Sequence, residues 1–258
     1  MTVHVGTCGW QYRDWRGRLY PATLRQADWL EHYAARFQTV EVDNTFYRLP
    51  EADTFATWRQ RTPRNFCMAL KTSRFLTHVK RLRDPAEPVQ LFMERAGTLG
   101  DKLGPLLLQL PPTFKADPVR VAAALDCFPR GVRVAFEPRH ESWFSDATRA
   151  VLDERDVALC LADSRQKPAG PVWRTARWTY VRFHEGLGHP HPCYQEAALH
   201  EWAERIAAEW GPRAQVFAYF NNDPGGCAVR DARLFAGAVR AAGLTATRVP
   251  AEDETPAG

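Results

Sequence analysis

Eight short apolar segments, separated by amphipathic helical patterns along almost the whole chain, constrain the fold of this sequence most. The expected strands cover residues 4–10, 39–47, 65–73, 105–112, 133–139, 158–164, 178–185 and 215–223. The expected helices cover residues 24–36, 89–103, 119–127, 147–155, 196–210 and 228–242. Strands that alternate with helices in this way predict a parallel sheet.

Eight strand–helix units in a chain of 258 residues predict an α/β fold of the TIM (β/α)8 barrel class. The competing fold, a doubly wound open sheet, usually carries a Gly-rich nucleotide-binding turn after its first strand, and this sequence has none there. We expect a single domain over residues 1–249. Residues 250–258, which are acidic and contain proline, predict a disordered tail.

The net charge of the chain does not identify the kind of molecule that it binds. The formal net charge is +4, which is mildly basic and does not by itself indicate nucleic acid. Residues 59–83 carry eight basic side chains and no acidic one. Such a run usually forms a solvated face balanced by acids elsewhere, and the alternative is a positive wall for an anionic ligand.

The cysteines and the N-terminus predict a location. The six cysteines are scattered without a CxxC pair, so we expect free thiols in a reducing cytoplasm. The chain begins with a predicted strand, without a secretory signal pattern, and contains no apolar run of membrane-spanning length. We therefore expect a cytoplasmic protein that does not interact with a membrane.

Polar residues at the ends of the predicted strands carry most of the functional signal, because nucleotide-binding and serine-hydrolase motifs are absent. In a barrel, the carboxyl ends of the strands form the site and alternate residues point inward. Seven of the eight strands become polar there, and this pattern favours a wet, ligand-binding mouth. The polar positions are Glu41, Asp43, Asn44, Tyr47, Arg48, Lys71, Arg74, His78, Gln109, Glu137, Arg139, His140, Trp143, Asp163, Tyr180, Arg182, His184, Tyr219, Asn221, Asn222 and Asp223.

The densest cluster is FEPRHESW, residues 136–143. It can supply a general base in Glu137, an anion clamp in Arg139 and a stacking platform in Trp143. His140 or His184 could act as the acid. The structural alternatives are a buried ion pair for Glu137, a helix cap for His140 and a rim seal for Trp143.

Two further kinds of site stay open at this stage. The turn at residues 221–226, Asn-Asn-Asp-Pro-Gly-Gly, could bind phosphate at the start of the last helix or form an ordinary turn. Several His, Asp and Glu residues are suitable metal ligands, yet no dedicated ligand spacing occurs, so a divalent metal is not excluded and not favoured.

Six ordered motifs resemble a known family. They are GTCGWQYRDWRGRLYP (6–21), VEVDNTFYRLP (40–50), LGPLLLQLPPTF (103–114), FEPRHESW (136–143), VRFHEG (181–186) and FNNDPGGCAVRDA (220–232). Together they resemble the DUF72 family, also called the YecE-like family, over nearly the whole chain. The resemblance implies a TIM barrel and no established reaction. Cys8 stands where the family often has serine, so no hydroxyl role is implied there.

Carried over by motif, the resemblance implies a set of site positions, which the chemistry of the residues divides into two groups. The catalytic candidates are Glu137, His184, His140, Lys71 and Glu41. The substrate-binding candidates are Trp10, Tyr12, Trp15, Asn44, Thr45, Tyr47, Gln109, Arg139, Trp143, Asp163, Arg182, Asn221 and Asn222.

These observations give one leading hypothesis and two alternatives. The leading one is a barrel enzyme that uses acid–base chemistry on a polar, anionic small molecule such as a sugar phosphate. The first alternative is a nucleic-acid-binding protein, or a metal-dependent nucleic-acid-processing one that resembles apurinic-site endonucleases at the level of fold. The second is a ligand-binding module without catalysis. The sequence requires no cofactor and does not specify an oligomeric state.

Overall fold

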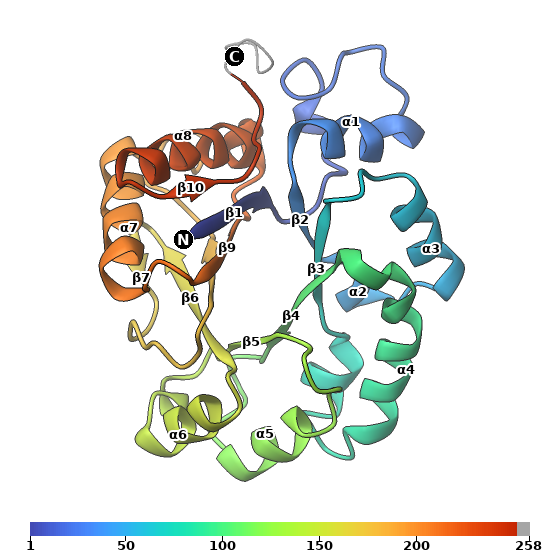
Figure 1. Cartoon of the computed structure of the whole chain (residues 1–258), viewed down its shortest axis with the longest axis vertical. Helices are drawn as coiled ribbons and strands as arrows, with labels where there is room; N and C mark the ends of the chain where they lie inside the picture. Colours follow the sequence, from blue (N-terminus) through green and yellow to red (C-terminus); the bar gives the residue numbers. More distant parts are fainter. Residues whose placement is uncertain (252–258) are drawn as a thin grey trace.

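The computed structural model describes residues 1–251, whose strands form one curved sheet with helices outside it (Figure 1). Eight parallel strands correspond to the eight predicted segments. They are β1 (Thr2–Thr7), β2 (Thr39–Val42), β3 (Cys67–Lys71), β4 (Leu103–Gln109), β5 (Val134–Glu137), β6 (Ala158–Ser164), β8 (Thr179–Phe183) and β9 (Gln215–Phe220). The α/β class with a parallel sheet is therefore confirmed.

The order of neighbouring strands is β10-β1-β9-β8-β6-β5-β4-β3-β2. The short strand β10 (Thr245–Ala246) extends the edge beside β1, and β7 (Lys167–Pro168) pairs antiparallel with β6. The sequence did not predict either of these two-residue strands, which are too short to give an alternating pattern.

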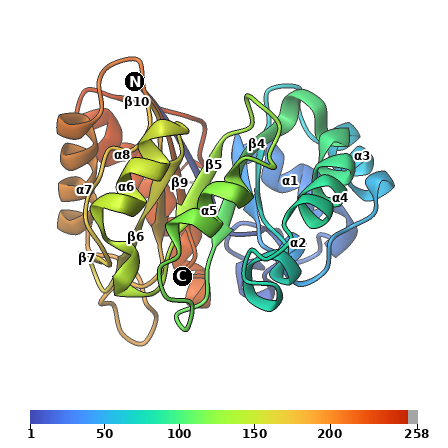
Figure 2. The ribbon, with the colours of Figure 1, turned by 90° about the horizontal axis from the view of Figure 1, so that it is seen from below.

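The helices cover the outside of the sheet, as Figure 2 shows from a second direction. They are α1 (Trp29–Arg36), α2 (Asn44–Tyr47), α3 (Ala52–Gln60), α4 (Ala86–Ala96), α5 (Pro118–Leu125), α6 (Asp146–Glu154), α7 (Glu196–Glu209) and α8 (Cys227–Ala241). Side-chain caps begin two of them. The carboxylate of Asp117 accepts the Arg120 backbone N–H before α5, and the Ser145 hydroxyl accepts that of Thr148 before α6.

The predicted strand over residues 39–47 is too long, and this part of the prediction was wrong. The strand ends at Val42, and α2 begins at Asn44. Aromatic and β-branched residues follow Val42, so local propensity favours a longer strand. The hydroxyl of Thr45 instead donates to the carbonyls of Val42 and Lys71, at 2.9 and 2.7 Å, and holds a tight turn at the strand end.

The two faces of the sheet bury separate cores. Side chains that point inward form a small cluster, and those that point outward pack under the helices. The inner cluster contains Cys8, Ala69, Leu107, Ala135, Ala158, Cys160, Ala176, Trp178, Tyr180, Phe217 and Tyr219. This alternation places polar residues that are in phase with the inner cluster on the inner face, at the carboxyl ends of the strands.

Strands β1 and β2 approach each other along a thin seam. One parallel bridge joins Cys8 to Glu41, and the backbone N–H of Gly9 donates to the Glu41 carbonyl at 2.7 Å. Farther back along the seam, a Cβ atom on Gly6 would lie only 2.4 Å from the carbonyl oxygen of Thr39. Glycine is therefore required there for the two strands to come this close.

The cysteine prediction was wrong for two of the six residues. Cys193 and Cys227 form a disulfide, with their Cα atoms 4.9 Å apart. Residues 186–194 fold back on themselves, and the Asn222 side chain holds this loop by donating to the Pro192 carbonyl at 2.9 Å. The partners are 34 residues apart in the sequence, so spacing alone could not pair them.

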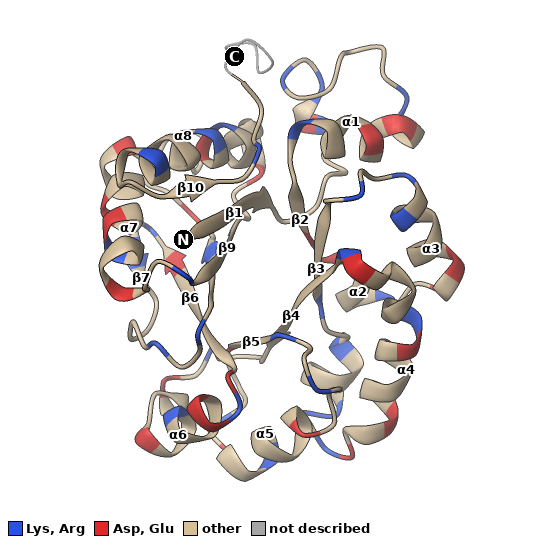
Figure 3. Ribbon diagram, viewed as in Figure 1, with Lys and Arg blue, Asp and Glu red and all other residues tan. Residues whose placement is uncertain are grey.

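The basic stretch at residues 59–83 does not form one positive wall. It is divided among α3, β3 and a π-helical turn, and Arg59, Arg61 and Lys80 each pair with a carboxylate. Figure 3 shows acidic and basic residues interspersed on the outer helices. The arrangement agrees with a solvated face whose charge is balanced by acids.

The C-terminal segment is described only in part. Pro250 is buried, and the remainder of the predicted tail, from residue 252 onward, lies outside the described residues. Within residues 1–251, no helix combines the length and the apolar character needed to cross a membrane.

Candidate functional site

Arg182 lies on the inner face of β8 between two buried glutamates. Its Nη2 donates to Glu41 Oε1 at 2.7 Å, and its Nη1 donates to Glu137 Oε2 at 2.9 Å. Each of these side chains is at most 1% exposed. The Tyr180 hydroxyl donates to the other oxygen of Glu41 at 2.5 Å. One guanidinium therefore joins β2, β5 and β8, and it compensates two carboxylates that could not otherwise be buried.

Both carboxylate oxygens of Glu137 are bound by other side chains of the protein. Its Oε2 also accepts from Gln109 Nε2 at 2.9 Å. Its Oε1 lies 2.5 Å from Arg139 Nη2 and 3.3 Å from His184 Nε2. Four neighbours thus share two oxygens, and this arrangement suits an orienting anion better than a base that must be free to accept a proton from substrate.

The two buried glutamates differ in their proton affinity. Burial alone would raise the pKa of Glu137, but Arg182, with His184 and Arg139, holds that pKa well below its usual range. Burial raises the pKa of Glu41, and the nearby Arg182 only partly offsets this effect. Glu137 is therefore the firmly ionised member of the pair.

His184 lies between the buried pair and the open end of the strands. Its Nε2 faces Glu137, and its Nδ1 lies 3.2 Å from Asn221 Nδ2. A neutral ring satisfies these two contacts when Nε2–H donates to the carboxylate and Nδ1 accepts from the amide. Arg139 Nη2, 3.1 Å from the same Nε2, then donates to Glu137 Oε1 and not to the ring. Burial lowers the pKa of His184, so the neutral form is favoured, and its side chain keeps 14% exposure.

A second ion pair lies at the end of β2 and β3. Lys71 Nζ is 3.6 Å from Asp43 Oδ1, and the same ammonium lies 4.5 Å from the centre of the Phe46 ring. Asp43 Oδ1 is also 3.6 Å from Arg182 Nη2. This pair therefore connects the buried cluster with the α2 turn.

Three possible metal ligands gather at the seam, but an arginine lies among them. Cys8 Sγ and carboxylate oxygens of Glu41 and Asp43 lie within 4.8 Å of one another. Arg182 Nη2 is 2.7 Å from the Glu41 oxygen, 3.6 Å from the Asp43 oxygen and 3.7 Å from the thiol sulfur. A guanidinium nitrogen thus supplies the positive charge here, and the residues do not fit a divalent metal at this point.

Part of the predicted set is brought together at this cluster. The members that meet there are Glu41, Lys71, Gln109, Glu137, Arg139, Arg182, His184 and Asn221. Asp43 and Tyr180 belong with them. Each alternates along its strand with other polar residues of the cluster, Asp43 with Glu41 and Tyr180 with Arg182. This alternation in the sequence could have added them to the site candidates. Nothing in the sequence indicated Phe46, because an aromatic residue that contacts a lysine in the fold cannot be told from an ordinary core residue by its sequence position.

Most of the predicted aromatic residues lie in the packing instead. Trp10, Trp15 and Trp143 are at most 4% exposed. The Trp143 indole donates to the Phe114 carbonyl at 2.7 Å, so this side chain seals the rim. Tyr47 is 77% exposed and lies apart from the cluster.

Four polar candidates have structural partners elsewhere. His140 caps the turn that follows β5, where its Nδ1 accepts the Ser142 backbone N–H at 3.1 Å. Asp163 points outward and accepts from two side chains under α7. Thr45 holds the end of β2, and Asn222 donates to Asp231 in α8 at 2.7 Å.

Asp223 adds an acidic group at the same end of the sheet. It follows Asn221 and Asn222 in the turn before α8, and it lies beside the half-buried Tyr12. Burial, with the neighbouring Asp43, raises the pKa of Asp223 to about 7, and the nearby Tyr12 hydroxyl partly offsets the rise. A carboxylate at this turn opposes phosphate binding there.

We expect Asp223→Asn to stabilise the protein at pH 8 and to have no such effect near pH 4. Between about pH 4 and 7 the folded protein keeps a proton on Asp223 that the unfolded chain has lost. The contribution of Asp223 to the free energy of unfolding therefore falls as pH rises through that window, by at most about 4 kcal/mol. Urea unfolding at both pH values measures it, with the exposed Glu204→Gln as control. Equal stability of wild type and Asp223→Asn at pH 8 would contradict this.

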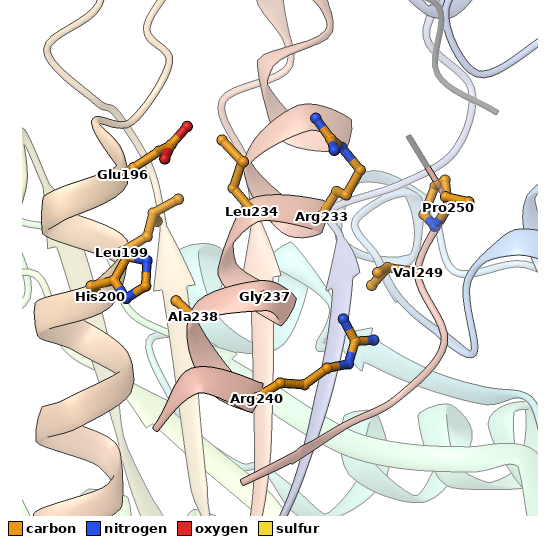
Figure 4. A pocket seen from close by; sticks show the side chains of 11 residues that line it. Glu196, Leu199, His200, Arg233, Leu234, Gly237, Ala238, Arg240, Val249 and Pro250 are labelled. Carbon is orange, nitrogen blue, oxygen red and sulfur yellow. The ribbon is translucent and has the colours of Figure 1, made fainter. Parts of the chain in front are cut away.

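Two cavities reach the polar cluster. One of about 150 Å³ is lined by residues 9–12 and 42–44, including Asp43. Another of about 280 Å³ is lined by Arg139 together with residues of β6 and the segment 168–171. A larger cavity of about 540 Å³ lies elsewhere, between α7, α8 and residues 249–251 (Figure 4). That cavity shares no residue with the cluster.

Comparisons with known proteins agree with this architecture. The sequence profile described as "Protein of unknown function DUF72" matches residues 4–255. UPF0759 protein YecE of Escherichia coli K12 is 27% identical over 235 residues, which cover 81% of this chain and 82% of that protein. UPF0759 protein YunF of Bacillus subtilis is 25% identical over 256 residues, covering 87% and 90% of the two chains.

A solved structure gives the same result for the fold. The crystal structure of a DUF72 family protein from Thermotoga maritima superposes with a TM-score of 0.79 and 26% sequence identity. The superposition covers 93% of this chain and all of that one. The similarity therefore extends over the whole sheet and its helices.

Proposed function

The chain belongs to the DUF72 family of proteins of unknown function, and from its own site we propose that it is an enzyme that transfers a proton on a polar small molecule carrying a negative group. The substrate binds at the carboxyl ends of the strands. The observation that carries this proposal is the position of His184, between the ionised Glu137 and the half-buried Asn221, next to the exposed end of Arg139.

His184 is the proton-transfer group in this proposal. Its neutral ring accepts a proton at Nδ1 once the substrate displaces the Asn221 amide, which binds Nδ1 through one hydrogen bond of 3.2 Å. Glu137 orients the ring from the other side and stabilises the imidazolium that forms. The proposal therefore moves the role of base from Glu137, which four neighbours already bind, to His184.

Two cations can hold the negative group of the substrate. Arg139 is 35% exposed and lies 3.1 Å from His184, so an anion that it binds is brought next to the imidazole. Lys71 has one carboxylate neighbour at 3.6 Å, a distance longer than a direct hydrogen bond, and its ammonium can turn toward an anion. Arg182 and Glu41 keep the structural role of a buried frame.

The proposal includes a closed eight-stranded (β/α)8 barrel as the scaffold. The bridge between Cys8 and Glu41 supports closure between β1 and β2, and so does the close approach at Gly6. The Arg182–Glu41 bond reinforces this seam from the inner face. Closure places the polar ends of β2, β3, β5, β8 and β9 around one mouth.

The alternatives predict different results. A ligand-binding module uses the same residues and returns its ligand unchanged. The nucleic-acid hypothesis is not strengthened by residues 59–83, because these basic residues are divided among three elements and form no single surface. The cytoplasmic location also stays a prediction.

The experiment combines ligand discovery with conversion. Native mass spectrometry against a metabolite extract identifies a bound compound, and incubation of that compound with the protein shows whether it is consumed. Lys71→Met should weaken its binding by about 10- to 100-fold, because a charge-assisted hydrogen bond is lost. The exposed Lys115→Met serves as the matched control. A bound compound that is never consumed contradicts the enzyme, and equal affinity of wild type and Lys71→Met contradicts the anion site.

A further inference from the structure

A second polar cavity lies at the opposite end of the sheet from the mouth. Its lining residues lie at the amino ends of β5, β6, β8 and β9, and its volume is about 840 Å³. We call it the arginine cavity. It is lined by Gly131, Arg133, Asp156, Arg174, Arg177, Trp178, Gly211, Pro212, Arg213, Ala214 and Gln215.

The charges in the arginine cavity are unbalanced. Four arginines line it together with a single acid, Asp156. That acid is taken by Arg177, whose Nη2 lies 3.3 Å from Asp156 Oδ2 and whose backbone N–H donates to Oδ1 at 2.8 Å. The other three guanidinium groups make no ion pair with any residue in the described range 1–251.

The unpaired arginines have different freedom. Arg133 is exposed, and its guanidinium lies over two rings, 5.9 Å from the centre of Trp178 and 5.7 Å from that of Phe217, which limits its movement. Arg174 and Arg213 are exposed and come from two separate loops. Arginines without a carboxylate partner also occur elsewhere in residues 1–251, Arg64 among them, so the lack of a partner alone shows nothing. Three such arginines around one concave surface whose single acid is already paired indicate an anionic ligand.

We propose that the arginine cavity binds a small polyanion, a molecule bearing a chain of two or more phosphate groups. The cavity of about 840 Å³ leaves room for linked phosphates, which can reach the guanidinium groups of three loops in turn, whereas one phosphate fills only a small part of that space. Guanidinium forks match phosphate oxygens in geometry as well as in charge. This site is independent of the proposed catalysis, because none of its residues lies at the carboxyl ends of the strands.

Isothermal titration with inorganic triphosphate, at about 50 mM salt so that screening is modest, tests the proposal. Wild type should bind saturably, and the Arg174→Ala/Arg213→Ala variant should bind at least about tenfold more weakly. Arg64→Ala/Arg83→Ala removes the same charge from exposed positions outside the cavity and should keep its affinity within about twofold. Circular dichroism checks that every variant is folded.

Four results would overturn the proposal. One is the absence of saturable binding by wild type. Another is an equal loss in both double variants, which would mean that only overall charge matters. A third is a loss of triphosphate binding in Lys71→Met but not in Arg174→Ala/Arg213→Ala, which would place the anion at the mouth. Tighter binding of duplex DNA than of triphosphate, lost in the same double variant, would also replace a small ligand by a nucleic acid.

Discussion

Replacing His184 by glutamine should lower turnover by about 100- to 10,000-fold, the range for loss of a positioned acid–base group. Glutamine can keep one hydrogen bond to Glu137 or Asn221 but cannot take up a proton near neutral pH. Because the substituted side chain lies at the edge of the cluster and keeps some exposure, we expect the variant to fold. The rate of consumption of the compound identified by mass spectrometry measures the effect.

His140 provides the matched control for this experiment. It is the other histidine that the sequence offered as an acid, and its Nδ1 is engaged in capping the turn after β5. His140→Gln should therefore change turnover by less than about tenfold, through the cap alone. A loss in His140→Gln as large as that in His184→Gln would reject the assignment of the proton transfer to His184.

Replacing Arg182 by alanine should destabilise the protein by about 3–5 kcal/mol, the usual cost of removing one partner from a buried ion pair. The substitution leaves Glu41 and Glu137 in the interior without the cation that both of them bind. Chemical denaturation followed by circular dichroism measures the difference. The exposed Arg177→Ala, which breaks a surface pair with Asp156, should cost no more than about 1 kcal/mol.

A second variant keeps this prediction testable if Arg182→Ala does not fold. Glu137 keeps its contact with Arg139, whereas the ion pair described for Glu41 in residues 1–251 is the one with Arg182. Adding Glu41→Gln to Arg182→Ala removes this stranded charge, so the double variant should be more stable than Arg182→Ala. An equal loss of unfolding free energy in Arg182→Ala and Arg177→Ala would mean that the bonds of Arg182 to the two buried glutamates contribute little to stability.

The period of two in the strands explains what could be predicted from the sequence. Glu41, Lys71, Glu137, Arg182 and His184 each lie in phase with inward-facing neighbours near the carboxyl end of a strand. A parallel sheet brings such ends together, and these five residues do meet in the structure. The position of the cluster could therefore be predicted before any contact was known.

The same rule also explains why Asp163 lies apart from the cluster. Asp163 is polar and lies near the end of β6, but it is in phase with Leu159 and Leu161, which point outward. Strict use of the alternation would have assigned it to the outer layer, where Trp202 binds it. The disulfide of Cys193 had no local signal, since only the folded loop brings it to α8.

The roles within the cluster depend on contacts that no pattern reveals. Glu137 looks like a base in the sequence because it is a carboxylate next to an arginine and a histidine. In the structure, four donors bind its two oxygens, and that coordination makes it an anchor. Partner number is a property of the folded chain, so it could not be deduced from the order of residues.

The Arg182 frame also has a consequence for the time course of folding. Its two bonds connect residues that are 141 and 45 positions apart in the chain. Contacts between such distant residues form late, because long loops must close before the contacts are made. The guanidinium can bond both glutamates only after β2, β5 and β8 have reached their places, so a competent mouth arises at the end of folding. Partly folded chains therefore do not yet hold the polar cluster in its final arrangement.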